Sequence, residues 1–193
     1  YHPMDQGMAR ELLGLPSGKR LLLFGALNVT DKRKGIDYLI EALRRMEKQD
    51  VELVVFGQVK DDIRGLFPVP IHSMGYLSDE SKIVALYNAV DMFITSSLEE
   101  NLPNTIMESM ACGTPCVGFE IGGIPEMIDH RVNGYVANYK DAGDLANGIQ
   151  WVLEHEDRLA LSDACVKKVQ ENYTEEVVAK QYTALYEKLL KGE

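Results

Sequence analysis

The hydrophobic positions of this chain form short continuous runs that alternate with longer, periodic segments. A short apolar run bounded by glycine or a turn signal is typical of a buried parallel strand. Such runs occupy residues 21–25, 51–57, 92–95, 116–119 and 134–137. Apolar residues at helical spacing predict helices over residues 36–43, 78–88 and 102–112, and from 141 onward with breaks near 156–157 and 173–174. Strands that alternate with helices indicate βαβ units, so the predicted fold class is α/β with a doubly wound parallel sheet.

Two of these helices have candidate capping residues. Ser78 is expected to cap the helix over 78–88, because a serine side chain accepts a hydrogen bond from a first-turn amide. Asn101 is expected to cap the following helix, with Leu102 and Pro103 in its first turn.

The predicted sheet also indicates where a ligand binds. In an open parallel sheet, ligands bind beyond the carboxyl ends of the strands. The loops of interest therefore follow Gly25, Gly57, Met74, Thr95 and Phe119.

The loop after the first strand carries three consecutive cations, Lys32, Arg33 and Lys34, followed by Gly35. Cations at a helix N-terminus oppose the helix dipole unless an anion lies between them. One interpretation is a phosphate-binding loop, in which Gly35 lets the backbone approach the ligand closely. The alternative is a solvated basic turn.

A polar stripe follows the strand at 92–95. Asn101, Asn104, Thr105 and Glu108 fall at i, i+3, i+4 and i+7, and Glu100 precedes them at the carboxyl end of the strand. Helix amides that hold a phosphate, and carboxylates that accept hydrogen bonds from sugar hydroxyls, would suit this arrangement. A solvent-facing polar side of the helix is the alternative interpretation.

Composition narrows the function classes. The 193 residues include 30 acidic and 20 basic side chains, a net charge of −10, which argues against sequence-independent binding of nucleic acid. Three cysteines are too few for a disulfide scaffold, and Cys112 and Cys116 are expected to be packing residues. No apolar run has the length of a membrane span, so no membrane anchor is expected in this chain. The chain begins with Tyr1, so a fragment of a longer protein is expected.

Several signatures of cofactor and metal sites are missing from the sequence. No Gly-x-Gly-x-x-Gly motif follows the first strand, which disfavours a dinucleotide-dependent dehydrogenase. No Asp-x-Asp pair is present to bridge a metal to a nucleotide diphosphate, and the histidines are scattered singly. Neither a cofactor nor a metal is therefore expected.

These residues together resemble a known family. The chain is similar to the C-terminal, donor-binding domain of GT-B glycosyltransferases of family 4, also called glycosyltransferase group 1. The resemblance covers almost the whole chain, and its most specific part is the pair Glu100 and Glu108 with seven residues between, followed by the segment 109–117. The segments 33–43 and 122–126 also match the family pattern.

The resemblance implies roles for four charged residues. Lys34 would bind the diphosphate of a nucleotide sugar, with Arg33 as its companion, and Glu100 would contact the transferred sugar. These three residues are the expected catalytic group. Glu108 would bind the ribose hydroxyls. Many members carry the companion arginine directly after the first strand, where this chain has Gly25-Ala26.

The resemblance also implies contacts from two loops. In the family the stretch after the first glutamate is often Gly-Phe-Gly; here residues 101–104 replace it, and Pro103 has no N–H to donate. Backbone amides would still meet the diphosphate, and the nucleobase would lie against the loop from Met74 to Leu77. The expected nucleotide-sugar-binding residues in these loops are Met74, Leu77, Asn101, Leu102, Asn104 and Thr105.

The implied activity belongs to a larger enzyme. Residues 1–193 would be the nucleotide-sugar-binding domain, with a C-terminal helix at 174–193, and the acceptor domain would lie N-terminal to this chain. The whole enzyme would transfer a hexose to a glycan or lipid with retention of anomeric configuration, in the cytoplasm or at the inner membrane face. This chain alone is expected to be inactive.

Two other functions stay open on sequence grounds. One is the NAD-type Rossmann domain of an oxidoreductase, which the absent glycine motif disfavours. The other is a non-catalytic module whose acidic surface binds a protein partner. Replacing Lys34 by alanine separates nucleotide binding from this last function.

Overall fold

A computed structural model of the chain describes residues 1–28, 31–46, 50–58 and 65–191. Within these ranges, six parallel strands form one sheet in the order β3-β2-β1-β4-β5-β6. They are β1 (Arg20–Asn28), β2 (Val51–Gln58), β3 (Ile71–Gly75), β4 (Met92–Thr95), β5 (Cys116–Phe119) and β6 (Gly134–Ala137). The strand order reverses between β1 and β4, so the loops after these two strands flank the switch point at which doubly wound sheets bind ligands. The predicted fold class is confirmed.

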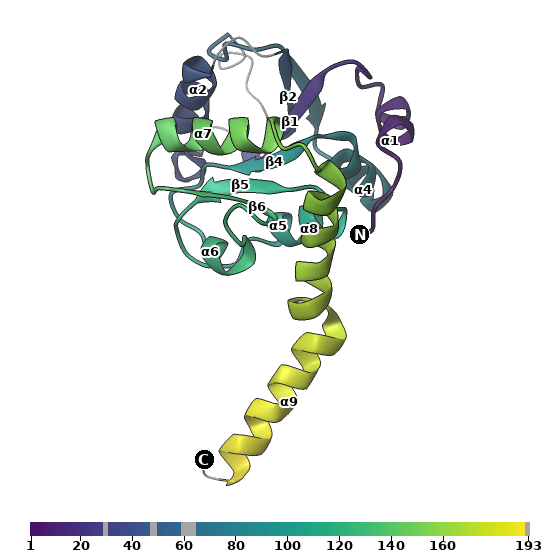
Figure 1. Cartoon of the computed structure of the whole chain (residues 1–193), viewed down its shortest axis with the longest axis vertical. Coiled ribbons are helices and arrows are strands. Elements are labelled where there is room, and N and C mark those ends of the chain that lie inside the picture. The colour runs from purple at the N-terminus through teal and green to yellow at the C-terminus, as the bar shows by residue number, and fades with distance from the viewer. Residues whose placement is uncertain (29–30, 47–49, 59–64, 192–193) are drawn as a thin grey trace.

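Helices cover both faces of the sheet (Figure 1). They are α1 (Gln6–Leu13), the 3₁₀ helix η1 (Lys32–Lys34), α2 (Ile36–Arg45), α4 (Glu80–Ala89), α5 (Asn104–Ala111), α6 (Ile124–Met127), α7 (Ala142–Leu153), α8 (Arg158–Asn172) and α9 (Glu175–Lys191). Alternate residues of β1 enter different cores: Leu22 packs with α2 and α7, whereas Leu23 packs with α1, α4 and α5. This burial of both strand faces explains why the strands read as continuous apolar runs.

Two helix starts differ from the prediction. Helix α4 begins at Glu80 and is capped by Asp79, whose carboxylate accepts from the amide of Ser81, so the prediction of Ser78 as the cap is wrong. An aspartate caps as well as a serine and its charge also favours the helix N-terminus, which explains the shift by one residue.

Helix α5 begins at Asn104, with Pro103 in extended conformation at the N-cap position. The prediction that Asn101 caps this helix is therefore wrong, and so is the placement of Leu102 and Pro103 in its first turn. The residue before a proline is disfavoured in helical conformation, which keeps Leu102 outside the helix. Met110 on α5 is buried against the sheet.

The apolar pattern did not predict α1 or β3. Helix α1 has only eight residues and buries only Ala9 and Arg10, so it supplies few apolar positions to the core. Strand β3 lies at the edge of the sheet, and its residues are half-buried or exposed.

The three cysteines are buried and free, which agrees with the packing role expected for Cys112 and Cys116 and extends it to Cys165. Burial raises the pKa of the Cys112 thiol to about 11 and that of the Cys116 thiol to about 12. Burial also raises the pKa of Cys165. The thiols are therefore neutral at physiological pH and serve the core as small apolar groups.

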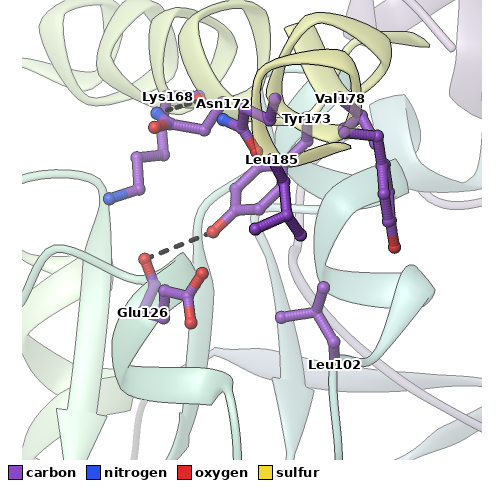
Figure 2. A pocket seen from close by; sticks show the side chains of 9 residues that line it. Leu102, Glu126, Lys168, Asn172, Tyr173, Val178 and Leu185 are labelled. Carbon is purple, nitrogen blue, oxygen red and sulfur yellow. Dashed lines mark hydrogen bonds between the residues drawn. The ribbon is translucent and has the colours of Figure 1, made fainter. Parts of the chain in front are cut away.

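Helix α9 extends away from the sheet and buries none of its residues (Figure 1). Helix α9 lies within the segment 174–193, of which residues 192 and 193 are outside the described ranges. The assignment of 1–193 to a nucleotide-sugar-binding domain with a C-terminal helix stays a prediction. A cavity of about 470 Å³ lies where α8 and α9 face the loop before α5 and helix α6 (Figure 2). There the hydroxyl of Tyr173 donates to the carbonyl of Glu126 at 3.3 Å.

No helix in the described ranges has the length and apolar character needed to span a membrane.

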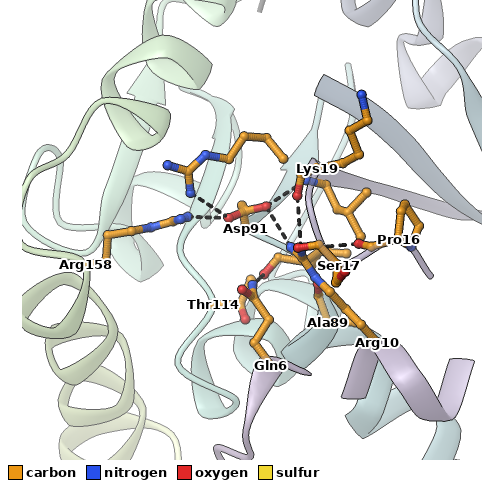
Figure 3. Close-up of polar contacts among 12 residues, drawn as sticks. Gln6, Arg10, Pro16, Ser17, Lys19, Ala89, Asp91, Thr114 and Arg158 are labelled. Atoms are coloured by element: carbon orange, nitrogen blue, oxygen red, sulfur yellow. Dashed lines mark hydrogen bonds and ion pairs between the residues drawn. The ribbon is translucent and has the colours of Figure 1, made fainter. Parts of the chain in front are cut away.

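A buried carboxylate joins three elements at the amino-terminal edge of the sheet (Figure 3). The Asp91 side chain is 2% exposed and contacts Arg10 at 3.1 Å, Arg20 at 3.3 Å and Arg158 at 2.6 Å, and it accepts from the amide of Leu21 at 2.7 Å. Arg10 is itself buried and also donates to backbone carbonyls of the α1–β1 loop and of α4. This cluster links α1 and α8 to the sheet.

Candidate functional site

The loops after β1 and β4 are bonded to each other at the carboxyl edge of the sheet. The amide of Leu98 donates to the carbonyl of Arg33 at 2.7 Å, and the hydroxyl of Ser96 donates to the carbonyl of Lys34 at 3.0 Å. The Lys34 ammonium meets the Glu100 carboxylate with 2.6 Å between Nζ and Oε1. Both side chains are largely removed from solvent, with 33% of Lys34 and 14% of Glu100 exposed. The structure thus brings together two of the predicted catalytic residues.

Gly35 makes this close approach possible. It ends η1 and precedes α2 with φ of 61°, a left-handed conformation that favours glycine. A Cβ atom at this position would lie 1.9 Å from the carbonyl oxygen of Ser96. Any side chain here would therefore push apart the loops that carry Lys34 and Glu100.

Replacing Gly35 by alanine is expected to lower the free energy of unfolding by about 2 kcal/mol or more, since left-handed strain of roughly 1–2 kcal/mol adds to the clash with Ser96. Urea denaturation followed by circular dichroism measures this change. Gly14→Ala isolates the strain, because Gly14 has φ of 65° but nothing within 4 Å of its Cβ position. Gly18→Ala, with neither feature, should change stability by less than about 0.5 kcal/mol. A Gly35→Ala protein as stable as Gly14→Ala would contradict the role of the close approach.

Arg33 lies beside Lys34 in η1, but its guanidinium contacts a different carboxylate. It binds Asp31 with 2.7 Å between Nη2 and Oδ2, and 67% of the Arg33 side chain is exposed. This contact lowers the pKa of Asp31 and raises that of Arg33. The structure therefore does not bring the Arg33 side chain to Glu100.

Glu108 lies on α5 and contacts a residue of α4 that belongs to none of the predicted site motifs. The hydroxyl of Tyr87, on α4, donates to Oε2 of Glu108 at 3.0 Å. Tyr87 is fully buried, and burial together with the nearby charge of Glu108 raises its pKa. The signal in the sequence was a tyrosine at the end of the apolar stretch 83–87, because a buried tyrosine needs a partner for its hydroxyl.

Helix α5 directly follows the loop that carries Glu100, and the amides of a helix's first turn point back toward its N-terminus. Pro103, at the N-cap position, makes no side-chain capping bond, so the amides of Asn104 and Thr105 have no capping side chain from that residue. Such amides and the helix dipole favour an anion. Leu102 is exposed and lines the cavity near α9. The other predicted site residues do not line this cavity.

A pair of glycines holds the loop after β5 against the Glu100 loop. Gly122 has φ of 54°, and a Cβ atom there would lie 2.1 Å from the Glu100 carbonyl oxygen. The amide of Gly123 donates to the carbonyl of Asn101. These contacts position residues 100 and 101 by their backbone.

Met74 and Leu77 lie at the carboxyl end of β3 and just beyond it. Both are half-buried and pack on the core that contains Tyr87. They lie at the same edge of the sheet as Lys34, but β3 is separated from β1 by β2.

Comparisons with known proteins agree on one family. The family described as "Glycosyl transferases group 1" matches residues 18–155. The N-acetyl-alpha-D-glucosaminyl L-malate synthase of Bacillus anthracis is 29% identical, with 100% of this chain and 52% of the relative covered.

Two solved structures show the same fold. The C-terminal domain of a group 1 glycosyl transferase family protein (LpcC) of Francisella tularensis has a TM-score of 0.74 at 20% identity, with 91% of this chain and 96% of that chain covered. The Anabaena protein Alr3699/HepE, in complex with UDP and glucose, has a TM-score of 0.73 at 21% identity, with 97% of this chain and 56% of that chain covered.

The chain spans about half the length of the first curated relatives it matches, with 52% and 47% of their lengths covered. Its fold matches that of the C-terminal domain of LpcC, the C-terminal half of a GT-B fold. The family match covers more than half of the chain, and its sheet has the order of the predicted doubly wound fold. This chain therefore belongs to the group 1 glycosyl transferases.

Proposed function

We propose that this chain binds the nucleotide-diphospho-sugar donor of a retaining hexosyltransferase. The observation that carries the proposal is the pairing of Lys34 with Glu100 at 2.6 Å, at the switch point of the sheet. A cation and a carboxylate held there serve the two parts of such a donor, its diphosphate and its sugar. The binding of UDP and glucose by the related fold of HepE supports this choice of ligand.

In this proposal the ligand takes the place of each partner in the ion pair of Lys34 with Glu100. The diphosphate attracts the Lys34 ammonium, which releases the Glu100 carboxylate to accept hydrogen bonds from hydroxyls of the sugar. The hydrogen bonds from the Leu98 amide to the Arg33 carbonyl and from the Ser96 hydroxyl to the Lys34 carbonyl keep both side chains in reach during this exchange.

The other predicted residues complete the donor site. Amides at Leu102, Asn104 and Thr105 bind the diphosphate, and Glu108 on the same helix binds the ribose hydroxyls. Arg33 joins the diphosphate only if it leaves Asp31, which it contacts in this structure. The nucleobase lies against the loop from Met74 to Leu77.

The chemistry proposed for these residues is electrostatic. When the bond between the sugar and the diphosphate breaks, negative charge grows on the leaving diphosphate, and Lys34 stabilises it. Glu100 holds the sugar in the orientation that transfer requires. The acceptor, a glycan or a lipid, binds to the remainder of the enzyme, which we place in the cytoplasm or at the inner membrane face.

Calorimetric titration of the 193-residue chain with UDP and GDP tests the proposal. Weak binding of at least one of them is expected, and the chain alone should transfer no sugar from the corresponding nucleotide sugar. Absence of binding of both at millimolar concentration would overturn the proposed function. Titration with NADH is the control, because binding of NADH in preference to UDP or GDP would support an oxidoreductase domain.

A further inference from the structure

A buried tyrosine hydroxyl contacts the carboxylate to which the proposed function assigns the ribose. Tyr87 Oη lies 3.0 Å from Glu108 Oε2. An ionised carboxylate only accepts hydrogen bonds, so the proton belongs to Tyr87. Burial raises the pKa of Tyr87, which keeps this donor protonated.

The tyrosine ring is fixed on several sides. It makes edge-to-face contacts with Phe93, Phe56 and Tyr1, with ring centroids 6.0, 6.4 and 6.1 Å apart. Its backbone carbonyl accepts from the hydroxyl of Thr114 at 2.7 Å. The hydroxyl therefore has a set position relative to Glu108 on α5.

Glu108 keeps acceptor capacity for a ligand. Glu108 comes four residues after Asn104 and three after Thr105. It therefore lies on the same face of α5 as these two residues of the first turn. A carboxylate offers about four lone-pair positions on its two oxygens. Tyr87 occupies one of these positions on Oε2. A glutamate that is already held loses less rotamer freedom when a ligand binds.

We propose that Tyr87 is a positioning residue, which orients the Glu108 carboxylate for two neighbouring hydroxyls of the ribose. The inference rests on the proposed function of Glu108 and adds to it the group that fixes the carboxylate. Tyr87 acts through Glu108 and does not itself contact the nucleotide.

Replacing Tyr87 by phenylalanine removes the hydroxyl and keeps the ring. The test compares UDP or GDP, whichever binds the unaltered chain, with its 2′,3′-dideoxy analogue. Affinity for the ribonucleotide should fall about three- to tenfold, because one hydrogen bond to a charged group no longer holds the carboxylate. Affinity for the dideoxy analogue should not change, so the preference for ribose should fall by the same factor.

Tyr135→Phe is the matched control. Tyr135 is also a buried tyrosine, and its hydroxyl donates to Oδ1 of Asp144 at 2.9 Å. Tyr135 lies on β6 and Asp144 on α7, so this pair is separate from α4 and α5. This variant should lose a similar amount of stability and keep the preference for ribose. A purely structural role of Tyr87 would make both variants behave alike, and that result would overturn the inference.

A second variant covers the case in which Tyr87→Phe does not fold. Glu108→Asp keeps the charge and withdraws the carboxylate from Tyr87 by one methylene, so the preference for ribose should fall as in Tyr87→Phe. If the preference is unchanged in the variant that folds, exact placement of the carboxylate does not matter and the inference fails. That failure is distinct from failure of the proposed function, in which the unaltered chain binds neither UDP nor GDP and both statements fall.

Discussion

Replacing Asp91 by alanine is expected to lower the free energy of unfolding by about 3–5 kcal/mol. Asp91 is the shared partner of Arg10, Arg20 and Arg158, and its removal leaves the buried guanidinium of Arg10 without a counter-charge. The amide of Leu21 loses its acceptor as well. Urea denaturation followed by circular dichroism measures the loss, and the variant should also expose α8 to faster hydrogen exchange.

Glu41→Ala is the control for this variant. Glu41 pairs with Arg45 one helical turn away at 2.8 Å, and 43% of its side chain is exposed. Removing such a surface pair should cost about 0.3–0.5 kcal/mol. Equal losses in the two variants would show that burial of Asp91 adds nothing to its contribution.

Replacing Lys34 by alanine is expected to weaken binding of UDP or GDP roughly 10- to 100-fold, since a charged hydrogen bond to the diphosphate is lost. The variant also leaves the Glu100 carboxylate without its partner, next to the expected position of the phosphates. Its repulsion of the ligand adds to the loss. Calorimetry with the unaltered chain and the variant measures the ratio of affinities.

Lys32→Ala changes the net charge by the same amount and is the matched control. Lys32 lies two residues from Lys34 in the same short helix, and its side chain is exposed. Its removal should change affinity by less than a factor of about three, because exposed charges are screened by solvent and salt. Equal losses in the two variants would indicate that the loop attracts anions only through its total charge.

The central strands were predictable because they are buried on both faces. Leu21 and Leu22 enter opposite cores, so the run could not alternate between apolar and polar residues. Strand β3 escaped prediction because an edge strand needs no such run, as the half-exposed His72 illustrates. Pro103 moved the start of α5 through a local conformational restriction that outweighs the capping preference of Asn101.

The basic loop and the paired glutamates were visible as local sequence patterns. The sheet rule placed both loops at the carboxyl edge of the strands, where the structure brings Lys34 to Glu100. Contacts between individual side chains of different helices were not visible, because no local pattern encodes them. Tyr87 and Glu108 are 21 residues apart and meet only through the packing of α4 against α5. Arg33 pairs with Asp31, its neighbour in the same loop. The sequence alone does not show whether Arg33 prefers this carboxylate or the expected diphosphate beside Lys34.

The ion pair of Lys34 with Glu100 also affects how the proposed ligand approaches. At close range the ammonium is neutralised by its own carboxylate, and Arg33 is neutralised by Asp31 in the same way. At low ionic strength, where the Debye length is long, an approaching anion senses mainly the −10 net charge of the chain. The net charge then does not attract the ligand, or repels it, so adding moderate salt should speed association of the ligand with the chain. In a basic phosphate-binding protein, added salt slows association. The attraction begins only when the diphosphate is near enough to compete with Glu100 for the lysine.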